Sequence, residues 1–203
     1  MKLYNSIGPN PQVVRMFIQE LGIDLESVEV DLMAGENRQQ DHLSRNPSGQ
    51  MPTLELDNGE FISEITVICD YLDEQHGYTD LIGKTPEDRA ETRMWTRRID
   101  LQIVEPLTNG FRFSEGHDFF KDRLRLIPQA ADDLKTLAQE RITWLDGQIE
   151  GKEFICGDRF SLADIMFYCF LNFGTTVGQP LNEDNKNVVN LYNKIHTRPS
   201  ASA

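Results

Sequence analysis

Apolar and polar positions in the first part of the chain alternate between strand-like and helix-like patterns. Met1 to Tyr4 reads as a short strand. After a break at residues 5–10, apolar side chains recur with the spacing of one helix face, at Val13, Val14, Phe17, Ile18 and Leu21. Ser27 to Leu32 then alternates with a period of two, as a strand does. This order predicts a strand–helix–strand unit, the beginning of an α/β layer.

The ends of the first helix carry their own signals. Asn10 is a favourable N-cap, and Pro11 suits the first helical position. Gly22 follows the last apolar position and predicts the C-terminal stop. With Asn10 as the cap, we expect Asn10→Ala to cost about 1 kcal/mol of stability.

The next segment predicts one short helix, two strands and a longer helix. Residues 34–46 are polar, with at most a short helix near 40–45. Thr53 to Leu56 and Phe61–Ile62 read as strands joined by the turn signal Asp57-Asn58-Gly59. Helical spacing begins near Glu64. The resulting order, β-α-β-α-β-β-α, is thioredoxin-like.

Met51-Pro52 stands directly before the third strand. Proline cannot donate to a strand ladder, so we expect this pair at the strand's start. A cis bond here would turn the chain sharply and leave the Met51 backbone groups free to pair with an extended peptide. In the alternative reading, Pro52 merely marks the boundary between loop and strand.

The remainder of the chain shows no convincing strand and predicts a helical bundle. Helix starts are expected at Thr85-Pro86 and at Ser161, and Pro106 should end or kink the helix that begins at Thr85. The other helical patterns are Phe120–Ile149, as one long helix or two pieces broken at Pro128, and Val188–Ile195. We therefore predict an α/β domain over residues 1–77, an all-α domain over 85–203 and a linker at 78–84.

The composition of the chain limits the kinds of partner and site that can be expected. The net charge of −13 disfavours binding to nucleic acid and to anionic membranes. The three cysteines form no closely spaced pair, which argues against a disulfide framework or a zinc site. No stretch is long enough to span a bilayer, so the cytoplasm is the expected location.

The segment from Asn46 to Leu72, NPSGQMPTLELDNGEFISEITVICDYL, resembles the second half of a glutathione transferase N-terminal domain. In that family the segment runs Gly-x-x-Pro, strand, turn, strand, Glu-Ser, helix. The helical half, with its Ser161-Leu162-Ala163-Asp164 box, is similar to the C-terminal domain of the same family. The resemblance extends over the whole chain and departs from the family at Ile65, where a serine is usual.

The resemblance implies a binding site for glutathione as co-substrate. It gives the Met51 backbone, beside Pro52, the task of holding the tripeptide, and it places Glu64 against the γ-glutamyl amine. The backbone N–H of Ile65 remains available for the γ-glutamyl carboxylate. The candidates for the glycyl end are Arg38, Gln39 and Gln50. As alternatives, Glu64 serves as a first-turn acid of its helix, and the glycyl-end candidates are solvated loop residues.

Two residues are candidates for the group that contacts the glutathione sulfur. There is no Tyr or Cys between Asn5 and Arg15, which excludes those two chemistries locally. Asn10 aligns with the sulfur-contacting position of some bacterial members, and its NH₂ could donate to a thiolate. Ser6 is the rival, with a hydroxyl donor. The alternatives are a plain helix cap for Asn10 and a turn residue for Ser6.

The second-substrate pocket is expected at Phe111, Arg112 and Phe113, which are equally suited to the interdomain core. No role is assigned to the four histidines, no metal site is expected, and Cys69 and Cys169 read as inert core thiols.

The function implied is that of a detoxifying glutathione transferase. It would act on a small electrophile, or reduce a disulfide or peroxide with glutathione. The alternative is a non-catalytic binding or regulatory protein of the same fold. We also expect a cis Met51-Pro52 bond and a homodimer.

Overall fold

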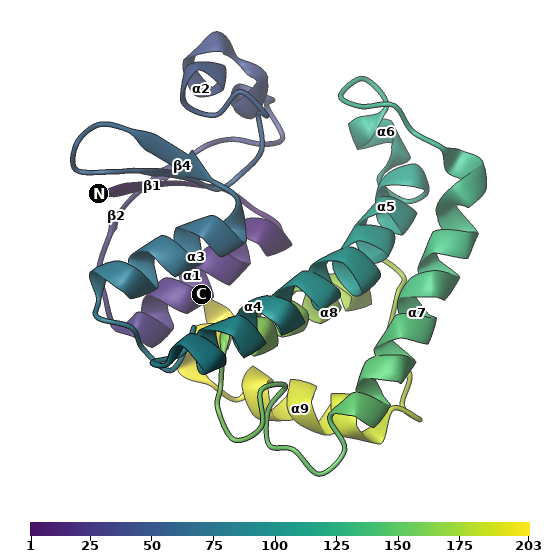
Figure 1. The fold of residues 1–203 in the computed structure, drawn as a ribbon. Helices are drawn as coiled ribbons and strands as arrows, with labels where there is room; N and C mark the ends of the chain where they lie inside the picture. The colour runs from purple at the N-terminus through teal and green to yellow at the C-terminus, as the bar shows by residue number, and fades with distance from the viewer.

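The computed structural model describes residues 1–203, and its N-terminal domain is built on one four-stranded sheet (Figure 1). The strands are β1 (Lys2–Asn5), β2 (Glu26–Glu29), β3 (Thr53–Glu55) and β4 (Phe61–Ser63), in the order β2-β1-β3-β4. β1 is parallel to β2 and antiparallel to β3, and β3 is antiparallel to β4. This arrangement confirms the predicted thioredoxin-like order, although β2 ends at Glu29, short of the expected Leu32.

Helices lie on both sides of the sheet, but only one face is closely covered. α1 (Pro9–Leu21) and α3 (Ile65–Gln75) pack together on one face, while α2 (Gln40–Arg45) lies apart on the other (Figure 1). A single turn of 3₁₀ helix, Glu36–Arg38, precedes α2. Under α2, a small apolar cluster is made by Tyr4, Val30 and Met51.

The start of α1 differs from the prediction. The N-cap is Gly8, with φ 106° and ψ 171°, so that Pro9 takes the first helical position. Asn10 and Pro11 therefore lie inside the first turn, and the Asn10 side chain makes no capping hydrogen bond. Two prolines, at positions 9 and 11, both suit a helix start, and the fixed φ of Pro9 lets the helix begin two residues earlier. The predicted Asn10 cap is wrong.

The regular elements of the C-terminal domain are all helices. Its α-helices are α4 (Pro86–Ile99), α5 (Glu105–Phe113), α6 (His117–Phe120), α7 (Ala131–Gln148), α8 (Leu162–Thr176) and α9 (Lys186–His196). Two isolated β-bridges, Phe154–Gly157 and Cys156–Arg159, lie between α7 and α8. Short 3₁₀ turns cover Pro128–Ala130 and Pro199–Ser202. Between α3 and α4, residues 76–85 hold no helix or strand; the exact domain boundary stays a prediction.

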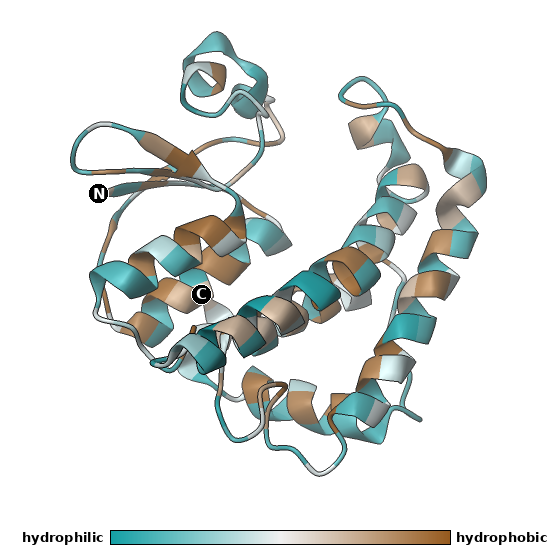
Figure 2. Ribbon diagram, in the orientation of Figure 1, coloured by the Kyte–Doolittle hydropathy of each residue, from teal (hydrophilic) through white to brown (hydrophobic).

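The helical run from α4 to α5 continues through Pro106. A π-helical segment, Asp100–Val104, joins the two helices, and the Glu105 N–H donates to the Asp100 carbonyl five residues earlier. The wider turn accommodates a residue that cannot donate, so Pro106 does not end the helix. Figure 2 shows the exposed side of α4 as largely hydrophilic.

The Phe120–Ile149 pattern divides into two pieces, as the alternative with a break at Pro128 foresaw. α6 ends at Phe120, and α7 begins at Ala131 after the Pro128 turn. Both predicted helix starts at Thr85 and Ser161 are confirmed, because each forms a reciprocal capping box.

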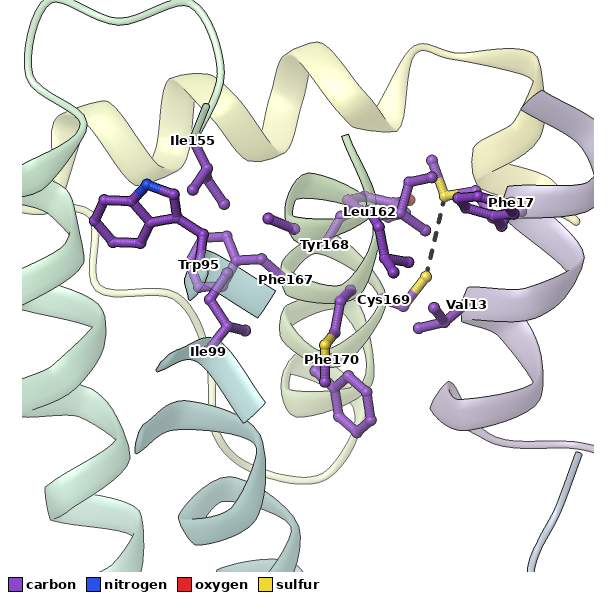
Figure 3. Close-up of a cluster of buried hydrophobic side chains, with 14 of the residues drawn as sticks. Val13, Phe17, Trp95, Ile99, Ile155, Leu162, Phe167, Tyr168, Cys169 and Phe170 are labelled. Atoms are coloured by element: carbon purple, nitrogen blue, oxygen red, sulfur yellow. Dashed lines mark hydrogen bonds between the residues drawn. The ribbon is translucent and has the colours of Figure 1, made fainter. Parts of the chain in front are cut away.

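The main core centres on α8. Phe167, Tyr168, Cys169 and Phe170 are at most 1% exposed. Figure 3 shows them between side chains of α1 on one side and of α4 on the other. The two domains are thus joined along α1 and α8 by one continuous apolar core.

Candidate glutathione site

Strand register brings most of the predicted site residues to one end of the sheet. Tyr4 pairs with Thr53, and Thr53 pairs with Ser63 on its other side. The residues just beyond this row are Asn5 and Ser6, Met51 and Pro52, and Glu64. The C-terminal end of β2 lies at the same edge, because β2 is parallel to β1. The helices α1 and α3 also begin there, so two helix N-termini and one loop meet.

The two candidates for the sulfur contact are in different environments. The Ser6 side chain is 3% exposed, and its hydroxyl donates to the Val30 carbonyl at 2.7 Å. Asn10 is half-buried, and its side-chain amide makes no hydrogen bond within the chain. Ser6 therefore has its proton engaged, whereas the Asn10 amide is free to donate.

The first turn of α1 has few backbone donors. Pro9 and Pro11 lack an N–H, and the Gln12 N–H donates to the Gly8 carbonyl at 3.2 Å. The Asn10 N–H makes no hydrogen bond within the chain. Asn10 thus presents both a backbone and a side-chain donor at the positive end of the helix dipole.

Met51 has the backbone geometry that peptide pairing requires. The Met51-Pro52 bond is cis, which confirms the prediction. The Met51 N–H and C=O make no hydrogen bond within the chain, although the residue itself is 7% exposed. An unpaired donor and acceptor on one residue are suited to an extended peptide lying alongside.

Three polar side chains that the sequence analysis did not single out hold this loop in place. Asn46 Nδ2 donates to the Gln50 carbonyl at 2.9 Å, and His42 Nε2 lies 3.3 Å from the same oxygen. Asn37 Nδ2 donates to the Gly49 carbonyl at 2.6 Å. All three side chains are buried. They fix the peptide planes on either side of Gln50 and thereby the direction of the Met51 N–H.

Gly49 is required in this loop. It has φ 62°, and a Cβ atom here would lie 3.0 Å from the Asn37 carbonyl oxygen. Arg38 lies close by, with its Nη1 3.4 Å from the Ser48 carbonyl oxygen. The side chains of Arg38, Gln39 and Gln50 are exposed beside this loop.

Glu64 and Ile65 form the start of α3. Glu64 is exposed and has φ 69° and ψ 120°, an uncommon conformation for a residue with a side chain. The N–H groups of Ile65 and Thr66 make no hydrogen bond within the chain. A carboxylate and free helix N–H groups side by side are suited to a ligand end that carries an amine and a carboxylate.

The helical domain contributes a further acid near this point. Burial raises the pKa of the Asp100 carboxyl, Arg97 opposes the rise, and the negative charges of Glu105 and Glu64 add to it. Asp100 therefore lies within electrostatic reach of Glu64.

The second-substrate candidates lie on α5. Phe111 and Arg112 are half-buried, whereas Phe113 is 9% exposed and belongs to the interior. Phe111 meets Phe120 and Phe173 edge-on, with centroid distances of 6.1 and 5.1 Å. Arg112 donates to Asn109 Oδ1 at 3.1 Å, and burial lowers the pKa of its guanidinium. Arg112 is thus a half-buried cation with no carboxylate within ion-pair distance.

The three thiols are buried and are poor nucleophiles. Cys69, Cys156 and Cys169 are free and buried, and burial raises the pKa of each thiol.

None of the helices is both long and apolar enough to cross a membrane.

Comparison with known proteins identifies the family of both domains. Residues 1–74 match the glutathione S-transferase N-terminal domain model, and residues 125–199 match the C-terminal domain model. The chain is 30% identical to glutathione S-transferase F10 of Arabidopsis thaliana, covering 88% of this chain and 84% of the relative. The crystal structure of Gtt2 from Saccharomyces cerevisiae superimposes with a TM-score of 0.93 at 28% identity, covering 100% of this chain and 99% of that one.

A thioredoxin-like domain with a four-stranded sheet, joined to a helical domain, defines the class. The chain belongs to the glutathione S-transferase family.

Proposed function

We propose that this protein binds glutathione and transfers its sulfur to a small electrophile, or uses it to reduce a disulfide or peroxide. The observation that carries the proposal is the unpaired Met51 backbone, flanked by the N-termini of α1 and α3 at one edge of the sheet. The tripeptide would pair with Met51, and its γ-glutamyl end would meet Glu64 and the N–H groups of α3. Its glycyl end would lie toward Arg38, Gln39 and Gln50.

In this arrangement the protein's chemical contribution is stabilisation of the thiolate. The start of α1 supplies a partial positive charge and the free Asn10 donors. Lowering the thiol pKa raises the fraction of thiolate near neutral pH, and the site positions it for attack. We put Asn10 before Ser6 as the sulfur contact, because the Ser6 proton already has an acceptor in Val30.

The experiment is a titration with glutathione by calorimetry, followed by turnover assays with an electrophile, a hydroperoxide and a mixed disulfide. We expect saturable binding and turnover of at least one substrate class. A protein that does not bind glutathione contradicts the proposal as a whole.

The second candidate function is that of a non-catalytic binding protein. The observation that supports it is the isoleucine at position 65. Its side chain cannot donate where the family usually has serine, so only backbone groups remain for the γ-glutamyl carboxylate. Glutathione binding without turnover of any substrate class would favour this candidate. Ile65→Ser should then strengthen binding by roughly the 0.5–1.5 kcal/mol of one hydrogen bond.

A further inference from the structure

We propose that Arg123 is a specificity-determining residue, which clasps the helical domain to the thioredoxin-like domain and thereby limits the size of the second substrate. The inference rests on the function proposed above. Arg123 makes no hydrogen bond, ion pair or cation–π contact with a predicted glutathione-binding residue, so it acts by positioning the segment that carries it.

The clasp joins two segments that are distant in sequence. Arg123 Nη1 donates to the Leu32 carbonyl at 3.0 Å, across 91 positions of the chain. The guanidinium carbon lies 3.7 Å from the centroid of the Phe119 ring. A flat cation held between a ring face and a carbonyl oxygen has its orientation fixed from two sides.

The contact lies far from the main junction of the domains. The apolar core joins them along α1 and α8, which lie in the middle of the molecule, whereas α2 and α6 stand at its upper end in Figure 1. Residues His117–Phe120 of α6 include no buried side chain. Packing alone therefore holds this segment weakly, and the hydrogen bond of Arg123 supplies a fixed point.

The acceptor belongs to a turn with its own backbone hydrogen bonds. The Leu32 carbonyl also accepts the Gly35 N–H at 3.2 Å, and the Glu36 N–H donates to the Asp31 carbonyl at 3.0 Å. The next residue, Asn37, ties this turn to Gly49 in the loop that precedes Met51. The clasp is thus anchored on the same scaffold as the candidate glutathione site.

The donor side is continuous with the expected second-substrate pocket. Phe119 meets Phe120 edge-on at 4.8 Å, and Phe120 meets Phe111 edge-on at 6.1 Å. The Arg112 guanidinium carbon lies 5.7 Å from the Phe120 centroid. Holding the Arg123 side chain in place therefore also holds a row of aromatic rings that ends at Phe111, with the Arg112 guanidinium beside it. Under the function proposed above, a bulky group on the glutathione sulfur would enter the space beside these rings.

The experiment measures the clasp and its effect on specificity separately. Arg123→Ala removes the donor, and Arg123→Lys keeps the charge with a smaller donor group. Arg125→Ala is the matched control. It also removes one arginine charge, but Arg125 lies two residues further along the chain and its side chain is exposed. Hydrogen exchange is followed over residues 30–36 and 114–127. Dissociation constants are measured for S-methylglutathione and S-(4-nitrobenzyl)glutathione.

We expect faster exchange in both segments for Arg123→Ala, an intermediate effect for Arg123→Lys and none for Arg125→Ala. In Arg123→Ala, the affinity for the nitrobenzyl conjugate relative to the methyl conjugate should rise by up to about tenfold. A tenfold change corresponds to a free energy near the smallest value found for a hydrogen bond with a charged donor. Unchanged exchange would overturn the clasp. Faster exchange with an unchanged affinity ratio would overturn its role in specificity.

These readouts require binding and no turnover. A wild-type protein that binds both conjugates but converts no substrate would contradict the proposed reaction while the affinity ratio still tests the clasp. A wild-type protein that binds neither conjugate would overturn both.

Discussion

At the scale of single residues, the structure reverses which of Asn10 and Ser6 matters for stability. The sequence favoured Asn10 as a helix cap, but Gly8 occupies that position. Ser6 is instead the buried residue with a hydrogen bond, to the Val30 carbonyl at 2.7 Å. Residue type alone could not reveal this, because both are good turn and cap residues.

This reversal yields a prediction for two variants. Ser6→Ala should lower the free energy of unfolding by roughly 1–3 kcal/mol, because the buried Val30 carbonyl loses a donor. Asn10→Ala should leave the melting temperature nearly unchanged but raise the pKa of the bound thiol. Loss of a hydrogen bond to a thiolate, about 1.5–3 kcal/mol, corresponds to about one to two decades in rate near neutral pH.

Thermal melting and the pH dependence of turnover, measured on both variants, check this prediction. A thiol pKa raised by Ser6→Ala and not by Asn10→Ala would make the protein serine-type. If neither variant changes the pKa, the Asn10 backbone N–H stabilises the thiolate.

Asp164 gives a prediction for pH. Burial raises the pKa of its carboxyl from 3.8 to about 6, against the hydrogen bonds from Ile155 and Ser161. Between these two values the folded state binds a proton that the unfolded state has released. The contribution of Asp164 to the free energy of unfolding therefore falls as the pH rises through this window.

Chemical denaturation of wild type and Asp164→Asn between about pH 4 and pH 7 measures this effect. The difference between the two free energies, wild type minus variant, should decrease with rising pH and level off above the folded-state pKa. The subtraction cancels the other carboxyl groups. A constant difference would show that Asp164 titrates normally.

At the scale of elements, the loop before β3 illustrates how tertiary contacts complete the site. Asn46 donates to the Gln50 carbonyl and to Thr53 Oγ1, and its Oδ1 accepts from the Ser48 hydroxyl at 2.7 Å. Asn46→Ala removes these bonds together and releases the peptide plane that orients the Met51 N–H.

We expect Asn46→Ala to lower the free energy of unfolding by about 2 kcal/mol or more and to weaken glutathione binding about tenfold or more. Asn58→Ala is the control, since Asn58 lies in the exposed β3–β4 turn at the other end of the sheet. Calorimetric titration and thermal melting of both variants check this. Equal glutathione affinity in wild type and Asn46→Ala would mean that the loop keeps its shape without these bonds.

The elements also show what sequence can and cannot predict. Capping boxes at Thr85 and Ser161 are local, so their sequence signal located two helix starts correctly. The passage of a helix through Pro106 depends on a π turn, and nothing in the residue types indicated it. The site residues that follow from strand register and motif were expected, whereas Asn37, His42 and Asn46 act through long-range contacts between polar segments.

At the scale of the whole molecule, α3, α4 and the π segment that follows α4 carry exposed apolar side chains as well as charges of both signs. Val67 on α3, Met94 on α4 and Leu101 in the π segment are 48%, 41% and 52% exposed. α3 and α4 lie side by side, joined by Arg93–Asp70 at 3.1 Å and Arg89–Glu74 at 2.6 Å (Figure 1). A surface with both signs of charge and apolar positions can pair with a second copy of itself through a two-fold axis.

We therefore predict a homodimer that uses this α3–α4 face. Met94→Glu combined with Leu101→Glu should shift the protein toward a 23.3 kDa monomer, because each new carboxylate would have to be desolvated at the interface. Leu137→Glu is the matched control, since Leu137 is 40% exposed on α7, away from this face. Sedimentation velocity at micromolar concentration distinguishes the outcomes. A wild-type protein that sediments only as a monomer contradicts the dimer. A dimer that survives the double variant but not Leu137→Glu would place the interface on α7.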